Sequence, residues 1–231
     1  MRQKNHPIPA SGTEAFLAWK DPQHTPHFQE LVRLLLSRFF CHGVLDDIPE
    51  ADIPLLVRLA ALHDIGKLWI PAEIINKSGS LTPEETVLMK KHTILGASFV
   101  EQALQGQEET PEYTYFREIC RHHHERWDGN GYPDGLRENE TPRYVQIIGM
   151  ADALDALLTR RSYRPAMDPE DAIWLVSKGG CGIFSPQLRA VFDHEIGHIV
   201  RAVYFPADFR ERDEAASLSP LQKEGISHAG A

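Results

Sequence analysis

The chain has 231 residues, of which 42% are hydrophobic, and a formal net charge of -9. That length and apolar content fit one folded domain with a sizeable core, whereas the acidic balance excludes DNA and RNA polymers as partners, because these need extended basic surfaces. No apolar run is long enough to span a membrane and the three cysteines form no CxxC pair, so we expect a cytoplasmic protein with reduced thiols and no membrane partner.

Apolar residues recur at helical spacing along most of the chain, without an alternating strand pattern of useful length. Thr82-Pro83-Glu84-Glu85 has the pattern of a capping box with proline at the first helical position. We expect helices over residues 26–42, 52–64, 82–104, 112–126 and 143–159, and two more opening at Asp168-Pro169 and Ser185-Pro186. Helices joined by short loops predict an all-α bundle.

The two ends differ in character from the rest of the chain. Residues 1–25 are polar and are expected to be poorly ordered, and residues 209–231 form a polar tail with little to bury. Residues 26–208 are therefore the expected folded domain, without an internal repeat or a second domain.

Two motifs carry the chemistry. Residues 63–67 read HDIGK, and residues 122–135 read HHHERWDGNGYPDG. Neighbouring imidazoles commonly hold divalent transition metals, and a carboxylate beside an imidazole can bridge two cations. The glycines and the proline that follow the histidines end a helix and begin a rigid loop. Together the motifs resemble the HD-GYP family of bacterial metal-dependent phosphodiesterases over about residues 27–206, and the resemblance implies a helical bundle of the HD superfamily in a free-standing version.

The resemblance implies seven ligands for two divalent transition metals, with iron or manganese favoured and nickel or zinc also compatible. One metal would be held by His27, His63, Asp64 and Asp152, and the other by Asp64, His92, His123 and His124. Read alone, His92 is also compatible with a surface histidine among lysines. Asp152 has apolar neighbours, and a charge there is costly unless it is paired or metal-bound.

Two positions required a choice. His27 is preferred to His24 and His42 because it lies sixteen residues before Gly43, as in the family. His122 is the extra histidine of its run, since the family pair stands directly before glutamate. A third metal in some members uses a glutamate where this chain has Gln23, so we expect two metals.

The same resemblance implies hydrolysis of cyclic di-GMP to the linear dinucleotide, and onward to GMP if the pocket is open enough, by a hydroxide that two metals activate. Asp64 and Lys67 would be catalytic, and Lys67, Tyr132, Arg161 and Arg164 would bind substrate. The first alternative is a cyclic-dinucleotide sensor. The second is a module that docks on GGDEF-type proteins through the loop containing Gly131-Tyr132-Pro133 (the GYP loop). The third is a phosphohydrolase of another nucleotide.

A rival motif occurs near the C-terminus. His194-Glu195-Ile196-Gly197-His198 fits the HExxH pattern of zinc peptidases. No further histidine follows at metzincin spacing, and the later acids lie in the polar tail. We therefore expect a packing helix whose two histidines are exposed or paired.

Overall fold

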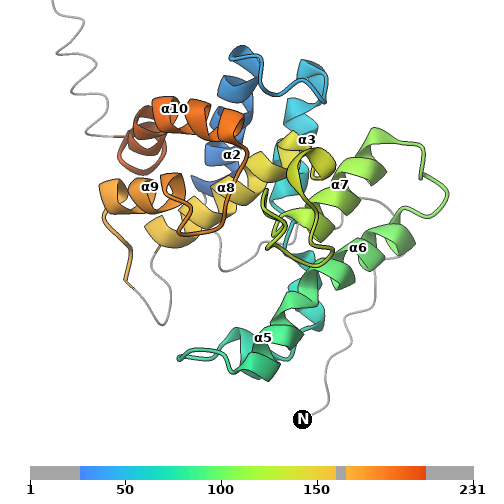
Figure 1. Ribbon diagram of the computed structural model, residues 1–231. Coiled ribbons are helices and arrows are strands. Elements are labelled where there is room, and N and C mark those ends of the chain that lie inside the picture. The colour runs from blue at the N-terminus through green and yellow to red at the C-terminus, as the bar shows by residue number, and fades with distance from the viewer. Residues whose placement is uncertain (1–26, 160–164, 207–231) are drawn as a thin grey trace, which may run out of the picture.

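The computed structural model describes residues 27–159 and 165–206 (Figure 1). Helices make up the architecture of these residues, in which the sole β feature is an isolated bridge between Asp128 and Arg137, so the predicted all-α class is confirmed. The α-helices are α2 (His27–Cys41), α3 (Ile53–Ala60), α4 (Ala72–Ile75), α5 (Pro83–Lys90), α6 (His92–Ala103), α7 (Pro111–His122), α8 (Arg143–Leu158), α9 (Pro169–Ser177) and α10 (Pro186–Tyr204). The 3-10 helices are η1 (Glu50–Asp52), η2 (Ile65–Trp69) and η3 (Glu138–Glu140). None of the described helices combines the length and the apolar character that a bilayer crossing needs.

Helix α8 is the centre of the bundle. Twelve of its sixteen residues are buried, and a helix buried nearly all round belongs inside a fold rather than on its surface. Helices α2, α7 and α9 pack against α8, and α10 packs against α2 and α9 (Figure 1). Asp152 is not among these twelve buried residues, and its side chain lines a cavity beside the central helix.

Two expected helices end earlier than predicted. Residues 61–64 form turns rather than a continuation of α3, and α7 ends at His122 rather than at residue 126. The expected helix over residues 82–104 is also wrong as a single element, because it is interrupted at Lys91. At that break the side chains of His92 and Thr93 bind the carbonyl oxygens of the preceding turn, which competes with the helical hydrogen-bond ladder.

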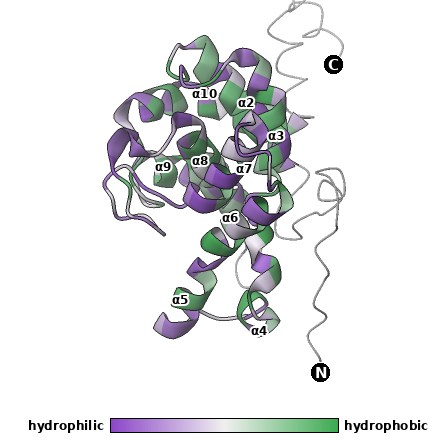
Figure 2. Cartoon of the chain, turned by 90° about the vertical axis from the view of Figure 1, so that its right-hand side faces the viewer, coloured by the Kyte–Doolittle hydropathy of each residue, from purple (hydrophilic) through white to green (hydrophobic). Residues whose placement is uncertain are grey.

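Two predicted helix starts are stabilised by side chains. The capping box of Thr82 and Glu85 is confirmed, with both reciprocal bonds formed. The carboxylate of Asp168 accepts the amide of Glu170 at 2.9 Å, and α10 opens after Ser185 without a side-chain cap. The helix that begins after Thr82 lies with α4 at one end of the molecule, away from the main group of helices (Figure 2). Residues 77–81, in the loop between α4 and α5, line a cavity.

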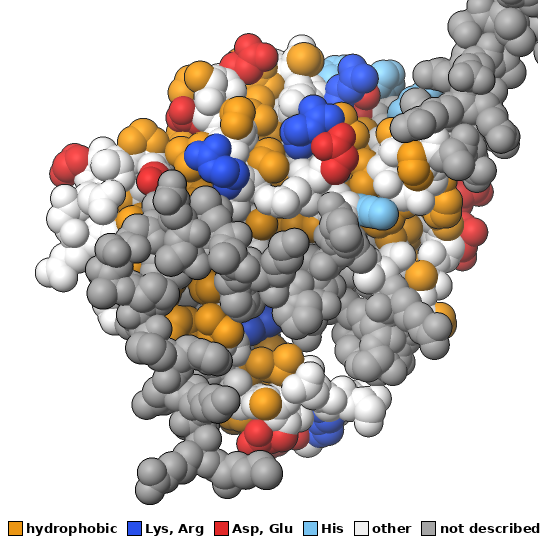
Figure 3. Space-filling view, turned by 180° about the vertical axis from the view of Figure 1, so that it is seen from behind, with side chains coloured by type: hydrophobic (Ala, Val, Ile, Leu, Met, Phe, Trp, Pro, Cys, Tyr) orange, Lys and Arg blue, Asp and Glu red, His pale blue; other side chains and the backbone are white. Residues whose placement is uncertain are grey.

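Surface charge is scattered on the described part of the rear face, where basic and acidic side chains stand among apolar ones and a few histidines (Figure 3). No broad basic stripe is visible on that described part, and the exclusion of nucleic-acid polymers, which rests on the net charge, stays a prediction. The expectations for residues 1–25 and 209–231 lie outside the described residues.

Candidate metal centre

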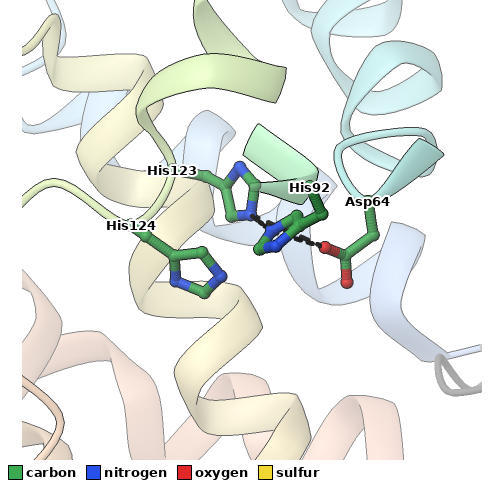
Figure 4. Close-up of side chains that lie close together, drawn as sticks. All are labelled: Asp64, His92, His123 and His124. Atoms are coloured by element: carbon green, nitrogen blue, oxygen red, sulfur yellow. Dashed lines mark hydrogen bonds and ion pairs between the residues drawn. The ribbon is translucent and has the colours of Figure 1, made fainter. Parts of the chain in front are cut away.

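Four side chains from three separate elements meet in the interior. Asp64 precedes η2, His92 opens α6, and His123 and His124 follow α7 (Figure 4). Their ligand atoms all lie within 4.8 Å of one another. His92 Nε2 is 3.1 Å from Asp64 Oδ1 and 3.3 Å from His123 Nε2. These four are the complete set predicted for the second of the two metals.

The tautomers of three histidines are fixed by the backbone. His63, His92 and His123 each direct Nδ1 at a carbonyl oxygen, which can only accept a hydrogen bond, so Nδ1 carries the proton. The acceptors are the oxygens of Ala60 at 2.7 Å, Met89 at 2.8 Å and Ile119 at 2.8 Å. In its neutral form each ring therefore presents the lone pair of Nε2 to the centre, which is the arrangement found behind metal-binding histidines.

This arrangement calls for a cation. The Nε2 atoms of His92 and His123 face each other at 3.3 Å, and with Nδ1 protonated both are acceptors in the neutral rings. Two lone pairs at that distance repel unless a proton or a metal ion lies near them. An imidazole and carboxylate donor set with these distances fits a divalent transition metal.

Burial keeps two of the histidines neutral. Desolvation, followed by the neighbouring His124, holds the pKa of His123 well below its ordinary value, and desolvation lowers the pKa of His124 to about 3. His63 differs: burial lowers its pKa, but the charges of Asp64 and Asp152 outweigh this and raise it to about 10. A protonated His63 would thus balance these carboxylates together with Lys67, which forms an ion pair with Asp64.

Two glycines allow the elements to approach closely enough to form the centre. A Cβ atom on Gly66 would lie 1.8 Å from the carbonyl oxygen of His92, so only glycine lets the HDIGK turn lie against the start of α6. A Cβ atom on Gly149 of α8 would lie 2.5 Å from the carbonyl oxygen of His123. The glycine of the first motif therefore has a packing role that places Asp64 beside His92.

The three remaining predicted ligands lie outside this group of four. His63 Nε2 is 3.4 Å from Asp64 Oδ2 and 3.7 Å from Asp152 Oδ1, so these two adjoin the group. His27 begins α2, and its ring packs edge-on against Tyr204 with centroids 5.2 Å apart. The Nδ1 atom of His27 is buried and has no hydrogen-bond partner among the described residues, which leaves a nitrogen available as a ligand.

A cavity of about 670 Å³ opens onto the centre. Its lining includes Asp64, His92, His124 and Asp152, together with the predicted substrate contacts Lys67 and Tyr132. The ring of Tyr132 stacks on that of His124 at 4.7 Å, and Lys67 forms an ion pair with Asp64. Arg161 and Arg164, like Gln23 and His24, lie outside the described residues.

Sequence reasoning missed two residues that shape this cavity. The buried carboxylate of Glu125 accepts three backbone amides of the GYP loop, at residues 134, 135 and 136. Arg126 lines the cavity, and its guanidinium donates to the carbonyl oxygens of His123, Glu125 and Cys181. In the sequence, a Glu-Arg pair after three histidines is typical of a solvated polar segment. Only its position next to the predicted ligands could have indicated that it shapes the cavity.

Three further histidines of the described residues, His122, His194 and His198, lie outside this group of four. His122 Nε2 contacts Asp134 at 3.0 Å rather than the group of four. On α10, both His194 and His198 are exposed while Phe192, Ile196 and Ile199 are buried, so the HExxH segment is a packing helix as expected. His198 is not a member of either candidate ligand group among the described residues, so His194 and His198 do not share a ligand group there.

Comparison with known proteins gives the family. The sequence profile of the HD domain matches residues 23–180. The chain belongs to the HD domain family. A probable cyclic di-GMP phosphodiesterase of Vibrio cholerae is 33% identical over 211 residues, covering 88% of this chain and 46% of that protein. A cyclic di-GMP phosphodiesterase of Thermotoga maritima is 38% identical over 161 residues, covering 68% and 40%. The resemblance to HD-GYP proteins is thus confirmed.

Other relatives are named for a different substrate. Three 3'3'-cGAMP-specific phosphodiesterases of Vibrio cholerae are 33% to 37% identical over 51% to 57% of this chain. Among solved structures, Bd1817, an HD-GYP-type protein of Bdellovibrio bacteriovorus, matches with a TM-score of 0.55 and 24% identity over 80% of this chain and 56% of that one, which supports the fold. The chain spans less than half the length of these curated relatives.

Proposed function

We propose that the chain is a metal-dependent phosphodiesterase that hydrolyses cyclic di-GMP to the linear dinucleotide, and onward to GMP where the product can turn in the cavity. The observation that carries the proposal is the group of Asp64, His92, His123 and His124 at a cavity of about 670 Å³. That volume lies within the range of small-molecule sites. Relatives named cyclic di-GMP phosphodiesterases support the substrate class.

The metals would be two divalent ions, iron or manganese by preference. Asp64, His92, His123 and His124 would hold one of them, and His27, His63, Asp64 and Asp152 would hold the other. When bound, such ions supply Lewis acidity at the phosphoryl group and lower the pKa of water. His27 would join the ligands through its unsatisfied Nδ1 atom. Tyr204 positions its ring, because the tyrosine hydroxyl is itself fixed by a 2.5 Å bond to buried Asp155.

The side chains of the cavity would bind and orient the substrate. Lys67, which pairs with Asp64, lies where its ammonium can meet a phosphate oxygen once Asp64 ligates metal. Tyr132 is fixed by its stacking on His124 and offers an aromatic face, over which Lys90 Nζ lies at 4.7 Å. A guanine base could stack on this ring once it displaces the Lys90 ammonium from that face. Arg161 and Arg164 remain predicted phosphate contacts.

The decisive experiment is chromatography of products after anaerobic loading with Fe²⁺ or Mn²⁺. Cyclic di-GMP and 3'3'-cGAMP should be offered separately, because relatives of both names match this chain. His123→Ala should abolish turnover and lower metal content. His122→Ala removes the neighbouring histidine, which contacts Asp134, and should keep both within about twofold.

Lys67→Ala separates an enzyme from a sensor. In an enzyme it should lower turnover by roughly a hundredfold, as expected for one charge-assisted contact to the reacting phosphate. Tight cyclic di-GMP binding with no turnover under any metal would instead identify a sensor. Turnover of 3'3'-cGAMP alone would keep the mechanism and change the substrate.

A further inference from the structure

A second group of metal-type ligands lies on the surface, between the end of α2 and the middle of α10. His42 follows the last residue of α2, while His194 and Glu195 lie on α10. Their ligand atoms all lie within 4.8 Å of one another. His42 Nε2 is 2.8 Å from Glu195 Oε1, and His194 Nδ1 is 3.0 Å from the same oxygen. Two imidazoles thus converge on one carboxylate oxygen from two separate helices.

These separations are close to those of a metal-bound set. For bonds of about 2.1 Å to a tetrahedral zinc ion, neighbouring ligand atoms lie about 3.4 Å apart. The two nitrogens, which lie within 4.8 Å of each other, would therefore have to draw back from the carboxylate oxygen by about 0.4 to 0.6 Å. The side chains of His42 and His194 are exposed by 39% and 74%, so small rotations are sterically open to both.

The carboxylate is already oriented for such a role. The side chain of Glu195 is only 13% exposed, and the hydrogen bond from His42 holds its pKa below the ordinary value, so it is ionised at neutral pH. Its other oxygen, Oε2, lies 3.6 Å from Arg38 Nε. One oxygen therefore faces the histidines while the second faces a cation from α2. This division resembles the outer contacts that orient metal-binding carboxylates.

We propose that His42, His194 and Glu195 form a surface site for a divalent transition ion of the zinc, nickel or copper type, with water completing the coordination. Imidazole and carboxylate ligands suit these ions, and their order of affinity favours them over Mn²⁺ and Fe²⁺. The site would link α2 to α10 and so clamp the two helices together. His198, the second histidine of the HExxH pattern, takes no part in it.

The surface site is separate from the buried centre. His27 stands at the beginning of α2 and His42 just past its end, fifteen residues later, which is roughly 22 Å along a helix. The two helices run antiparallel, since His27 contacts Tyr204 at the end of α10 while His42 contacts Glu195 nearer its middle. An ion at the surface site would thus link α2 to α10 at the end of this helix pair that lies away from His27.

The test uses protein whose buried centre is already loaded and which has been washed with a weak chelator. Equilibrium dialysis against free Zn²⁺, followed by elemental analysis, then counts the additional ions per chain. We expect one further zinc ion in the wild type, and at least a tenfold weaker affinity in His194→Ala and in Glu195→Gln. His198→Ala, which removes an exposed histidine one turn along α10, should keep the additional ion.

A second measurement checks that the helices are linked. Zinc should raise the unfolding temperature of the wild type and of His198→Ala, but not of His194→Ala, because an ion that binds only the folded state stabilises it. Hydrolysis should be unchanged in His194→Ala, so failure of this site and failure of the proposed phosphodiesterase are distinguishable. No additional zinc in the wild type, or an additional ion that persists in both His194→Ala and Glu195→Gln, would overturn the proposal. Equal loss in His198→Ala would do the same.

Discussion

Glu125 offers the most direct test of how the GYP loop is held. Its Oε1 atom accepts the amides of Asp134 at 2.7 Å and Gly135 at 3.1 Å, and its Oε2 atom accepts the amide of Leu136 at 3.0 Å. The side chain is 2% exposed, so these bonds are shielded from water. A glutamine at this position keeps one oxygen for the first two amides but turns an NH₂ group toward the amide of Leu136.

Glu125→Gln therefore loses one charge-assisted bond and sets two donors against each other. Hydrogen bonds to charged groups contribute about 1.5 to 3 kcal/mol each, and the two bonds that remain also lose the negative charge. We expect the unfolding free energy to fall by about 2 to 4 kcal/mol, measured by urea denaturation. Amide exchange at residues 134–136 should quicken by about thirtyfold or more, since 1.4 kcal/mol corresponds to a factor of ten.

The control is Glu109→Gln, the same chemical change at an exposed side chain. It should alter the unfolding free energy by less than about 0.5 kcal/mol. If Glu125→Gln matched this control in both stability and exchange, the three bonds would not be what holds the loop. If stability fell while exchange at residues 134–136 stayed at the wild-type rate relative to the rest of the chain, the effect would be global rather than local to the loop.

Three further changes follow from single contacts. Gly66→Ala should lower the unfolding free energy by about 3 kcal/mol or more, because the added Cβ atom would overlap the backbone of α6. Gly79→Ala, where no atom lies within 4 Å of the added Cβ, should be near neutral in the same denaturation assay. The hydrogen bond from Arg121 holds the pKa of Asp134 below its ordinary value, so the stability from this pair is complete above about pH 4 and is lost as the pH falls through the lowered pKa. Arg121→Gln should move that pKa back upward in an NMR titration. Thr82→Ala should cost about 1 kcal/mol by removing the cap on the amide of Glu85, and faster amide exchange confined to the first turn of α5 would show it.

Much of the fold could be predicted from local patterns. The apolar stripe of α2, the capping box at Thr82 and the proline-led starts of α9 and α10 are each determined within a few residues, and each is present. The candidate ligand group could be predicted because the two motifs combine histidines and carboxylates that rarely cluster on a solvated surface. Periodicity says nothing about tertiary contacts, however. The part played by the loop of residues 77–81 and by Arg126 in lining the cavity required knowledge of which elements face one another.

The misplaced helix ends share one physical cause. The carbonyl oxygens in the last turn of a helix have no intrahelical partner and need donors from elsewhere. Ala60, Met89 and Ile119 stand in the last turns of α3, α5 and α7, and each accepts Nδ1–H from a histidine three or four residues later.

Ending these helices therefore serves the site. Each imidazole bond adds a second donor to a backbone oxygen, fixes the histidine tautomer and aims Nε2 at the centre. The oxygens of Ala60 and Ile119 also accept backbone amides, at 3.2 Å and 3.3 Å, so the imidazole bond orients the ring at the point where a longer helix would have continued. Sequence periodicity favours that longer helix in all three cases, so it fails at the candidate ligands, where the proposed function and local propensity conflict.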